Sequence, residues 1–199
     1  LFPFWEETLK KIFPTPTTTA YNTLILTGAI GIGKTLVAVV CLLYLLYRLL
    51  CLKDPYLFYG MQPIDKISIS LMNITIENAK GVALDKMNQL ILSSEWFLAH
   101  GKMAGQTNLK FLPDKHIELI CGSSNNQIIG RAIFANFTDE VNWGLTNDVQ
   151  KLKKKQKQLI SQTDARMRSR FLRGTYLPTL NIIASSKNSE QSFLEDYID

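Results

Sequence analysis

Apolar and polar positions divide this chain into strands and helices that follow one another. Residues 23–27 form an apolar run with β-branched residues, which predicts a strand, and 36–52 is an almost wholly apolar run of helical length. Residues 66–76 alternate with the period of a strand, and 77–92 carry apolar residues at helical spacing. Strands that alternate with helices predict an α/β sandwich with a mostly parallel central sheet flanked by helices.

The remaining segments extend this pattern towards both ends of the chain. A hairpin is predicted from 111–112 and 116–121, on either side of Pro113 and Asp114. The pattern further indicates two strands (132–137 and 179–184) and three helices (6–13, 93–98 and 150–170). Because the sequence contains no internal repeat, we expect 1–199 to form a single domain. In parallel sheets of this kind, ligands bind at the carboxyl ends of the strands.

A glycine-rich loop joins the strand at 23–27 to the apolar helix. The loop matches the pattern G-x-x-x-x-G-K-[ST] with Gly28, Ala29, Ile30, Gly31, Ile32, Gly33, Lys34 and Thr35. Glycines let backbone N–H groups curl around phosphates, Lys34 reaches the β- and γ-phosphates, and the Thr35 hydroxyl takes a place on Mg²⁺. The sequence therefore predicts a nucleoside triphosphate site in a three-layer P-loop NTPase domain of the RecA/ASCE-like type.

An acidic pair follows the predicted strand at 132–137. Asp139 is expected to hold Mg²⁺, mostly through water, and Glu140 to polarise the water that attacks the γ-phosphate. Asn136 departs from the apolar strand that usually precedes such a pair. A hydrolytic glutamate beside the metal aspartate is typical of ATP-driven motors, and the N-K-x-D motif of switch-type GTPases does not occur in the sequence.

Two serines, Ser185 and Ser186, follow the last predicted strand. In ATP-driven motors a polar residue at a neighbouring strand tip senses the γ-phosphate and couples its loss to movement. A Ser-Ser turn after a strand is also an ordinary structural feature. The residues alone leave both interpretations open.

Composition and charge narrow the class of protein. The chain is 46% hydrophobic and 20% charged, which is typical of a protein with a packed core. Its three cysteines lack the spacing of metal ligands and indicate reduced thiols in a cytosolic protein. The apolar run at 36–52 contains Arg48 and begins at the phosphate loop, which favours a buried helix over a membrane span.

A basic segment occupies 150–173, with nine Lys and Arg residues against a single acid, Asp164. Such a cluster suits contact with a DNA backbone, and a solvated helix face has the same composition. The candidate DNA contacts are Lys153, Lys154, Lys155, Lys157, Arg166, Arg168 and Arg170.

Four stretches taken together resemble the ATPase domain of the large terminase subunit of tailed bacteriophages. They are 27–35, 69–97, 128–143 and 181–190. The resemblance implies that the loop binds ATP and Mg²⁺, that Asp139 holds the metal and that Glu140 is the catalytic base. It also implies that Ser185 and Ser186 form the coupling motif.

The resemblance extends to three further residues, with departures from the family pattern. Trp5 and Glu6 lie where terminases place an aromatic-Gln contact to adenine, and Glu6 replaces the glutamine. Many terminases carry an arginine inside the phosphate loop, and this loop has none. Arg131 precedes the acidic strand where the family places an arginine finger that acts on the neighbouring subunit, so it is the first candidate for that role.

As a terminase ATPase domain, the chain is expected to be a motor that moves double-stranded DNA into a prohead. The implied partners are the portal protein, the small terminase subunit and further copies of the chain in a ring, with no membrane. The implied location is the cytoplasm of an infected bacterium, with transient docking on the prohead. Segment 1–20 would lie beside adenine, 150–175 would be the basic segment, and the family's nuclease domain and activity are expected to be absent.

Two other functions remain open at the level of sequence. One is a helicase-like DNA-dependent ATPase, which would normally need a second RecA-like domain. The other is a nucleotide-binding scaffold with weak hydrolysis, for which Asn136 and the missing loop arginine are hints.

Overall fold

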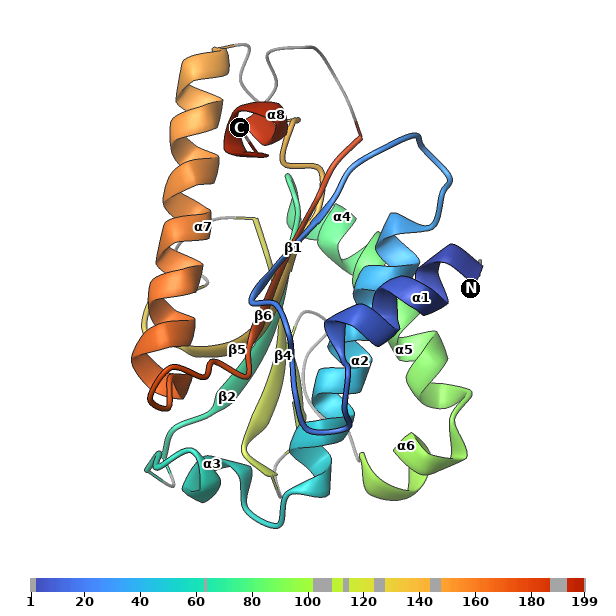
Figure 1. Cartoon of the computed structure of the whole chain (residues 1–199), viewed down its shortest axis with the longest axis vertical. Helices are drawn as coiled ribbons and strands as arrows, with labels where there is room; N and C mark the ends of the chain where they lie inside the picture. Colours follow the sequence, from blue (N-terminus) through green and yellow to red (C-terminus); the bar gives the residue numbers. More distant parts are fainter. Residues whose placement is uncertain are drawn as a thin grey trace.

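A computed structural model of the chain shows one six-stranded sheet between two layers of helices (Figure 1). It describes residues 3–62, 64–101, 109–112, 115–123, 128–143, 148–186 and 193–198. The strands are β1 (Thr23–Leu26), β2 (Ile67–Met72), β3 (Leu109–Leu112), β4 (Ile117–Gly122), β5 (Ala132–Thr138) and β6 (Leu180–Ala184).

The strands follow one another across the sheet in the order β1-β6-β5-β2-β4-β3. All neighbours from β1 to β4 pair in parallel, and β3 pairs antiparallel with β4 at the edge. This arrangement confirms the predicted hairpin and the mostly parallel sheet. Because β6 lies between β1 and β5, it separates the strand before the phosphate loop from the strand before the acidic pair.

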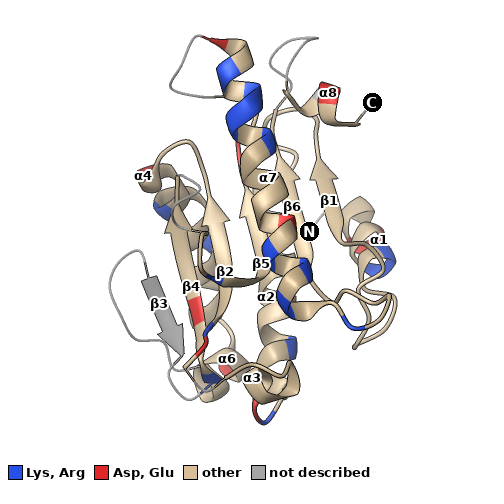
Figure 2. Ribbon diagram, turned by 90° about the vertical axis from the view of Figure 1, so that its left-hand side faces the viewer, with Lys and Arg blue, Asp and Glu red and all other residues tan. Residues whose placement is uncertain are grey.

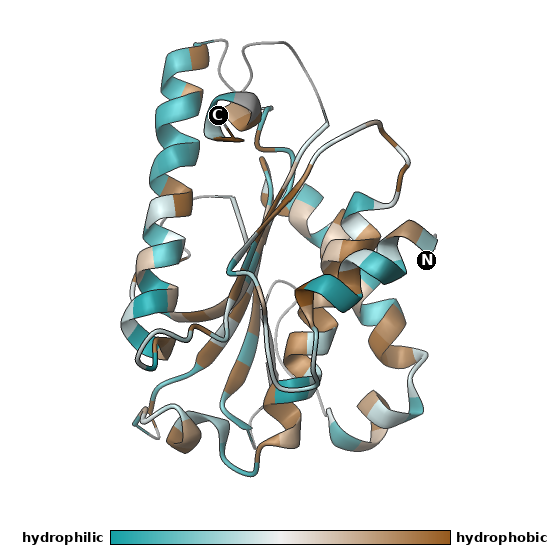
Figure 3. Ribbon diagram, viewed as in Figure 1, coloured by the Kyte–Doolittle hydropathy of each residue, from teal (hydrophilic) through white to brown (hydrophobic). Residues whose placement is uncertain are grey.

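Helices cover both faces of the sheet. The helical elements are α1 (Pro3–Ile12), α2 (Lys34–Cys51), α3 (Pro55–Phe58), α4 (Ile76–Asn78), the π-helical segment η1 (Ala79–Leu84), α5 (Asp85–Leu92), α6 (Glu95–His100), α7 (Val149–Phe171) and α8 (Phe193–Ile198). In Figure 1, α7 and α8 lie on one side of the sheet, and α1, α2, α5 and α6 lie on the other. Figure 3 shows that α2 is mostly hydrophobic whereas α7 is mostly hydrophilic.

Helix α2 is a core helix, as its apolar composition and its start at the phosphate loop predict. It is the single described helix long and apolar enough to span a membrane. In the fold, Leu42, Leu45 and Leu46 on this helix are 0–1% exposed and pack in the main core. Arg48 turns its guanidinium to the preceding loop and donates to Thr19 Oγ1 at 2.7 Å.

Several element boundaries differ from the sequence prediction. Strand β2 ends at Met72, four residues before the predicted end, because Thr75 caps α4 by accepting a hydrogen bond from the Asn78 N–H at 3.1 Å. Helix α3 is a single turn with Pro55 at its start, inside a stretch predicted as a loop. Helix α8 was not predicted from the sequence.

Asn136, the polar interruption in β5, is the centre of a buried hydrogen-bond network. Its Oδ1 accepts from Ser70 Oγ at 2.6 Å, and its Nδ2 donates to Thr138 Oγ1 at 2.8 Å and to Asn181 Oδ1 at 2.9 Å. Asn181 in turn donates to Asp164 on α7 at 3.0 Å. The network joins three strands to α7, so Asn136 is a satisfied buried group and gives no support for a degenerate active site.

Candidate nucleotide-hydrolysis site

The loop between β1 and α2 has the backbone conformation that the glycine pattern predicts. Gly28, Gly31 and Gly33 have φ angles of 126°, 88° and 89°, which side-chain-bearing residues rarely adopt. At Gly28 an added Cβ would lie only 2.9 Å from Ile32 Cδ1. Gly33 is the N-cap of α2, so the positive end of this helix faces the loop.

Lys34 lies across the loop and is 8% exposed. Its Nζ donates to the carbonyl oxygens of Gly28 (3.0 Å) and Ala29 (2.8 Å), and to Ser186 Oγ at 3.4 Å. All three of these acceptors are neutral. The arrangement therefore favours replacement of the carbonyl contacts by charged phosphate oxygens when a triphosphate binds.

Trp5 supports the phosphate loop from α1. Its ring is 6% exposed, and its Nε1 donates to the Ile32 carbonyl at 2.8 Å. A Cβ added to Gly33 would meet the same indole nitrogen at 3.4 Å. The ring of Trp5 therefore packs against the loop, and Glu6 beside it is exposed. The adenine contact of both residues stays a prediction.

The acidic pair meets the phosphate loop at the carboxyl edge of the sheet. Asp139 is 6% exposed, and its N–H donates to the Met72 carbonyl at 2.9 Å. Its Oδ1 accepts from the Glu140 N–H at 3.0 Å, and its Oδ2 accepts from Thr35 Oγ1 at 3.4 Å. The fold thus brings together the two residues predicted to hold Mg²⁺, although they lie far apart in the sequence.

The residues at this point fit Mg²⁺. A hydroxyl and a carboxylate are the oxygen donors that this ion prefers, and Mg²⁺ usually takes its other ligands from phosphates and water. Among the described residues there is no cluster of three or more His, Cys, Asp or Glu side chains. A phosphate-bound Mg²⁺ needs no such cluster, so Thr35 and Asp139 are sufficient protein ligands.

Glu140 has a left-handed backbone with a φ of 57°, one of two such non-glycine residues in the described chain. This conformation is strained for glutamate and is characteristic of functional positions. The carboxylate of Glu140 accepts a hydrogen bond from Ser185 Oγ at 3.4 Å. Ser185 thus contacts the predicted base, and Ser186 contacts Lys34, so the tip of β6 touches both charged groups.

Asn142 is a site residue that sequence reasoning missed. Its N–H donates to Ser185 Oγ at 3.2 Å, and its Nδ2 donates to the Ser186 carbonyl at 3.1 Å. Its Oδ1 accepts from the Leu194 N–H in α8 at 2.9 Å. Asn142 therefore fixes the acidic loop to the tip of β6 and to α8. An asparagine two residues after a glutamate carries no motif, so the sequence alone offered no signal for this role.

Burial is the main cause that raises the pKa of Asp139 from its ordinary 3.8 to about 6, and the charge of Glu140 adds to the rise. The hydrogen bonds from the Glu140 N–H and Thr35, and the charge of Lys34, act in the opposite direction. The native carboxyl therefore keeps its proton between pH 3.8 and about 6, where the unfolded carboxyl has lost it. Without metal, the stability of the fold should fall as the pH rises through this window.

Asp139→Asn should therefore stabilise the metal-free protein at pH 7.5, by no more than about 3 kcal/mol, because a neutral amide removes the buried charge. The gain should shrink as the pH falls towards 4, where the native carboxyl is protonated. Urea unfolding of both proteins in EDTA, measured from pH 4.5 to 7.5, checks this. A variant less stable than the wild type at pH 7.5 would contradict the conclusion that burial of the Asp139 charge destabilises the metal-free fold.

Arg131 lies at the opposite end of the sheet from this site. It precedes β5, whereas Asp139 follows β5, and seven strand residues span roughly 20 Å. Its guanidinium forms an ion pair with the buried carboxylate of Glu118 on β4. The structure therefore does not bring Arg131 to Lys34 within one chain. Its action on a neighbouring subunit stays a prediction.

The basic segment consists mostly of helix α7, and Figure 2 shows Lys and Arg positions along the length of this helix. Lys153 pairs with Asp196 on α8 at 2.5 Å, and Lys155 lines a cavity that also contains Asp139. Arg170 lines a separate cavity together with Arg131. The other predicted DNA contacts lie on the same helix: Lys154, Lys157 and Arg168 are exposed, and Arg166 is partly exposed.

Comparison with solved structures gives matches that include two phage large terminases. The HK97 bacteriophage large terminase superposes with a TM-score of 0.61 at 14% identity, covering 100% of this chain and 36% of that protein. The large terminase of the thermophilic bacteriophage D6E gives a TM-score of 0.48 at 13% identity, covering 88% of this chain and 36% of that protein. The chain thus spans about a third of the length of each.

Comparison with curated protein sequences gives no significant match. One family of related sequences, described as "Uncharacterized protein MJ0330, N-terminal P-loop domain", matches residues 9–172. The match includes the phosphate loop, the acidic pair and the whole of α7. The chain therefore belongs to the MJ0330 N-terminal P-loop domain family and has the P-loop NTPase fold found in the large terminase of HK97.

Proposed function

We propose that this domain hydrolyses ATP and uses hydrolysis to move double-stranded DNA, as the ATPase domain of a viral terminase large subunit. One observation carries the hydrolysis: Lys34, at the start of α2, meets Asp139 and Glu140, which follow β5, at the carboxyl edge of the sheet. Contacts from Thr35 and from the tip of β6 link these three groups. A site that bound nucleotide without hydrolysis would have no need of the second carboxylate.

The roles of the residues follow from their positions. The glycine loop surrounds the phosphates with N–H donors, and Lys34 exchanges its carbonyl partners for β- and γ-phosphate oxygens. Glu140 orients the attacking water and accepts its proton. Mg²⁺ held by Thr35 and Asp139 would neutralise charge on the phosphates.

The two serines at the tip of β6 can couple ATP hydrolysis to movement of other parts of the domain. Ser186 contacts Lys34, and Ser185 contacts Glu140, so loss of the γ-phosphate changes the surroundings of both serines together. Asn142 joins this tip to α8 through its contact with the Leu194 N–H. A change at the γ-phosphate can therefore reach the helices that cover the α7 face of the sheet.

Movement of DNA is supported by the exposed basic residues of α7, among them Lys154, Lys157 and Arg168, and by the fold shared with the HK97 large terminase. The loop contains no arginine, so positive charge for the transition state must come from another residue. Arg131 of a neighbouring copy is our first candidate, which requires a ring of subunits. In the full assembly we expect the portal, the prohead and the small terminase subunit as partners.

Duplex DNA should raise the rate of ATP turnover several-fold, and the increase should weaken steeply with salt. The double variant Lys154→Gln/Lys157→Gln should lose most of the increase, because both side chains are exposed on α7. The matched control is Lys10→Gln/Lys11→Gln on α1, which removes equal charge elsewhere. Phosphate release measured with and without duplex DNA provides the comparison.

Two outcomes separate the rival functions. Robust strand separation on forked DNA would contradict packaging and favour a helicase-like ATPase. If DNA left the rate of ATP turnover unchanged in both the wild type and the α7 variant, the protein would be an ATPase, and its proposed role in moving DNA would be contradicted.

A further inference from the structure

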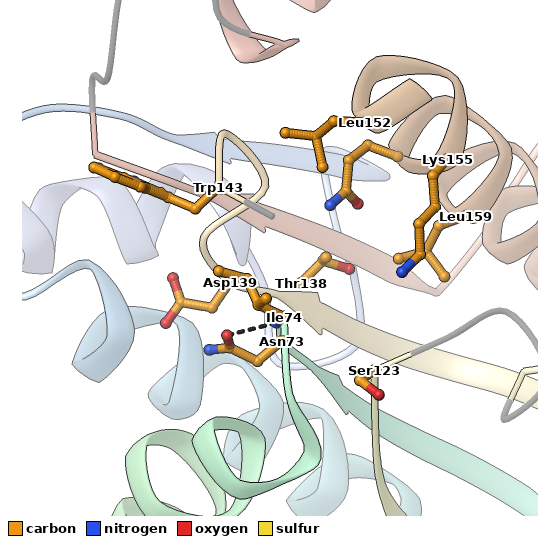
Figure 4. A pocket seen from close by; sticks show the side chains of 10 residues that line it. Asn73, Ile74, Ser123, Thr138, Asp139, Trp143, Leu152, Lys155 and Leu159 are labelled. Atoms are coloured by element: carbon orange, nitrogen blue, oxygen red, sulfur yellow. Dashed lines mark hydrogen bonds between the residues drawn. The ribbon is translucent and has the colours of Figure 1, made fainter. Parts of the chain in front are cut away.

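A cavity of about 270 Å³ lies beside the acidic pair, between the carboxyl edge of the sheet and α7 (Figure 4). Asn73 and Ile74 line it from the end of β2, Asp139 from the end of β5, and Leu152 and Leu159 from α7. The cavity is distinct from the phosphate loop, since none of the residues 28–35 lines it. It shares only Asp139 with the nucleotide-hydrolysis residues assigned above.

Gln156, on α7, lines this cavity with an unused hydrogen-bond acceptor. Its side chain is 9% exposed, and its Oε1 has no hydrogen-bond partner among the described residues. A buried amide oxygen without a donor costs about 1–3 kcal/mol. Such a group is explained if a ligand supplies an N–H or O–H donor inside the cavity.

Two further side chains define what that ligand must offer. Trp143 lines the cavity and is 44% exposed, so its indole ring is available to stack on a flat partner. Lys155 lines the same cavity and is exposed, so its ammonium can meet an anion there. In Figure 4 the Trp143 ring and the Lys155 side chain lie on opposite sides of the view, with Asp139 and Thr138 between them.

From these groups we infer that the cavity is a second nucleotide site, which takes one nucleoside phosphate. The base stacks on Trp143 and donates an N–H to Gln156 Oε1, and the phosphate pairs with Lys155. The volume of about 270 Å³ is just below the usual range of about 300–1,000 Å³ for ligand pockets, so the cavity limits the ligand to one nucleotide at most. This inference does not depend on the proposed ATP hydrolysis or DNA movement, because it is argued only from the residues that line the cavity.

The nucleotide can come from a free monophosphate or from an unpaired position of a strand. Binding is therefore measured with two probes: the four deoxynucleoside 5′-monophosphates, and a fluorescein-labelled single-stranded 12-mer. Both are titrated while Mg²⁺ and a non-hydrolysable ATP analogue saturate the phosphate loop. This saturation separates failure of the second site from failure of the ATP site.

Gln156→Leu should weaken binding about three- to tenfold, through loss of one hydrogen bond. Trp143→Leu should weaken it about tenfold, through loss of base stacking. Gln162→Leu is the matched control: Gln162 also lies on α7 with an unpartnered buried Oε1, but it lines a different cavity. Thermal unfolding should show Gln156→Leu to be at least as stable as the wild type, because the change removes a buried unpaired oxygen.

Each outcome decides the inference. Monophosphate binding that is sensitive to Gln156→Leu and Trp143→Leu, but not to Gln162→Leu, supports a site for free nucleotides. The same sensitivity with the 12-mer alone supports a site for a strand. Absence of binding by both probes, or binding that the Gln156 and Trp143 variants leave unchanged, overturns the second site.

Discussion

Glu140→Gln should leave ATP binding within about threefold of the wild type and lower kcat by roughly a thousandfold, the middle of the range for loss of a general base. Glutamine has the same shape, and its carbonyl oxygen can still accept the hydrogen bond from Ser185. An amide, however, accepts no proton from the attacking water. Phosphate release at saturating ATP and Mg²⁺ measures kcat, and titration with a labelled ATP analogue measures binding.

Glu7→Gln is the matched control, because Glu7 is an exposed acid on α1. Its kcat should equal that of the wild type. If Glu140→Gln retained a kcat within tenfold of the wild type, Glu140 would not be the base. If it lost ATP binding as well, its role would be structural.

Lys34→Ala should weaken ATP binding at least a hundredfold. Among the described residues, Lys34 is the one lysine whose ammonium contacts the backbone of the phosphate loop. Hydrogen bonds from a charged group contribute about 1.5–3 kcal/mol each. Loss of two such bonds to the β- and γ-phosphates corresponds to roughly a hundredfold or more in affinity. Calorimetric titration with a non-hydrolysable ATP analogue and Mg²⁺ measures the loss.

The substitution also frees the Gly28 and Ala29 carbonyls, which can turn to water at this exposed edge. A circular dichroism spectrum and melting curve close to those of the wild type would show that the loss lies in binding. Lys10→Ala, on an exposed position of α1, controls for the change in net charge. Unchanged ATP affinity in Lys34→Ala would contradict the phosphate-loop assignment.

The parts of the site that could be predicted are those set by local sequence. The glycines of residues 28–33 fix the loop conformation by themselves, and Lys34 and Thr35 follow at the start of a helix. Asp139 could be placed because it follows a strand, and the carboxyl ends of parallel strands share one edge of the sheet. The strand order that brings β6 between β1 and β5 was needed to place Ser185 and Ser186 at the site.

The parts that could not be predicted depend on packing between distant elements. Asn142 has no motif, and its three contacts come from β6 and α8. Gln156 looks like one more polar residue of a basic helix until α7 is packed on the sheet. Asn136 departs from the expected apolar strand pattern. In the fold it is buried, and its amide forms hydrogen bonds with residues of two neighbouring strands.

Arg131 shows a limit of reasoning from adjacency in the sequence. It stands next to the strand that ends in the acidic pair, yet a strand separates its two ends by its whole length. The structure places it in an ion pair with Glu118, at the other end of the sheet. Only a neighbouring subunit could present such a residue to the phosphate site.

The most direct test of ATP hydrolysis is steady-state phosphate release by the wild-type protein. It is measured at saturating ATP and Mg²⁺ with duplex DNA, over protein concentrations high enough for copies to assemble. We expect turnover on the order of 1 s⁻¹ or faster, rising with protein concentration as neighbouring subunits complete each other's sites. A protein that binds ATP and releases no phosphate at any concentration would contradict hydrolysis and identify a nucleotide-binding scaffold.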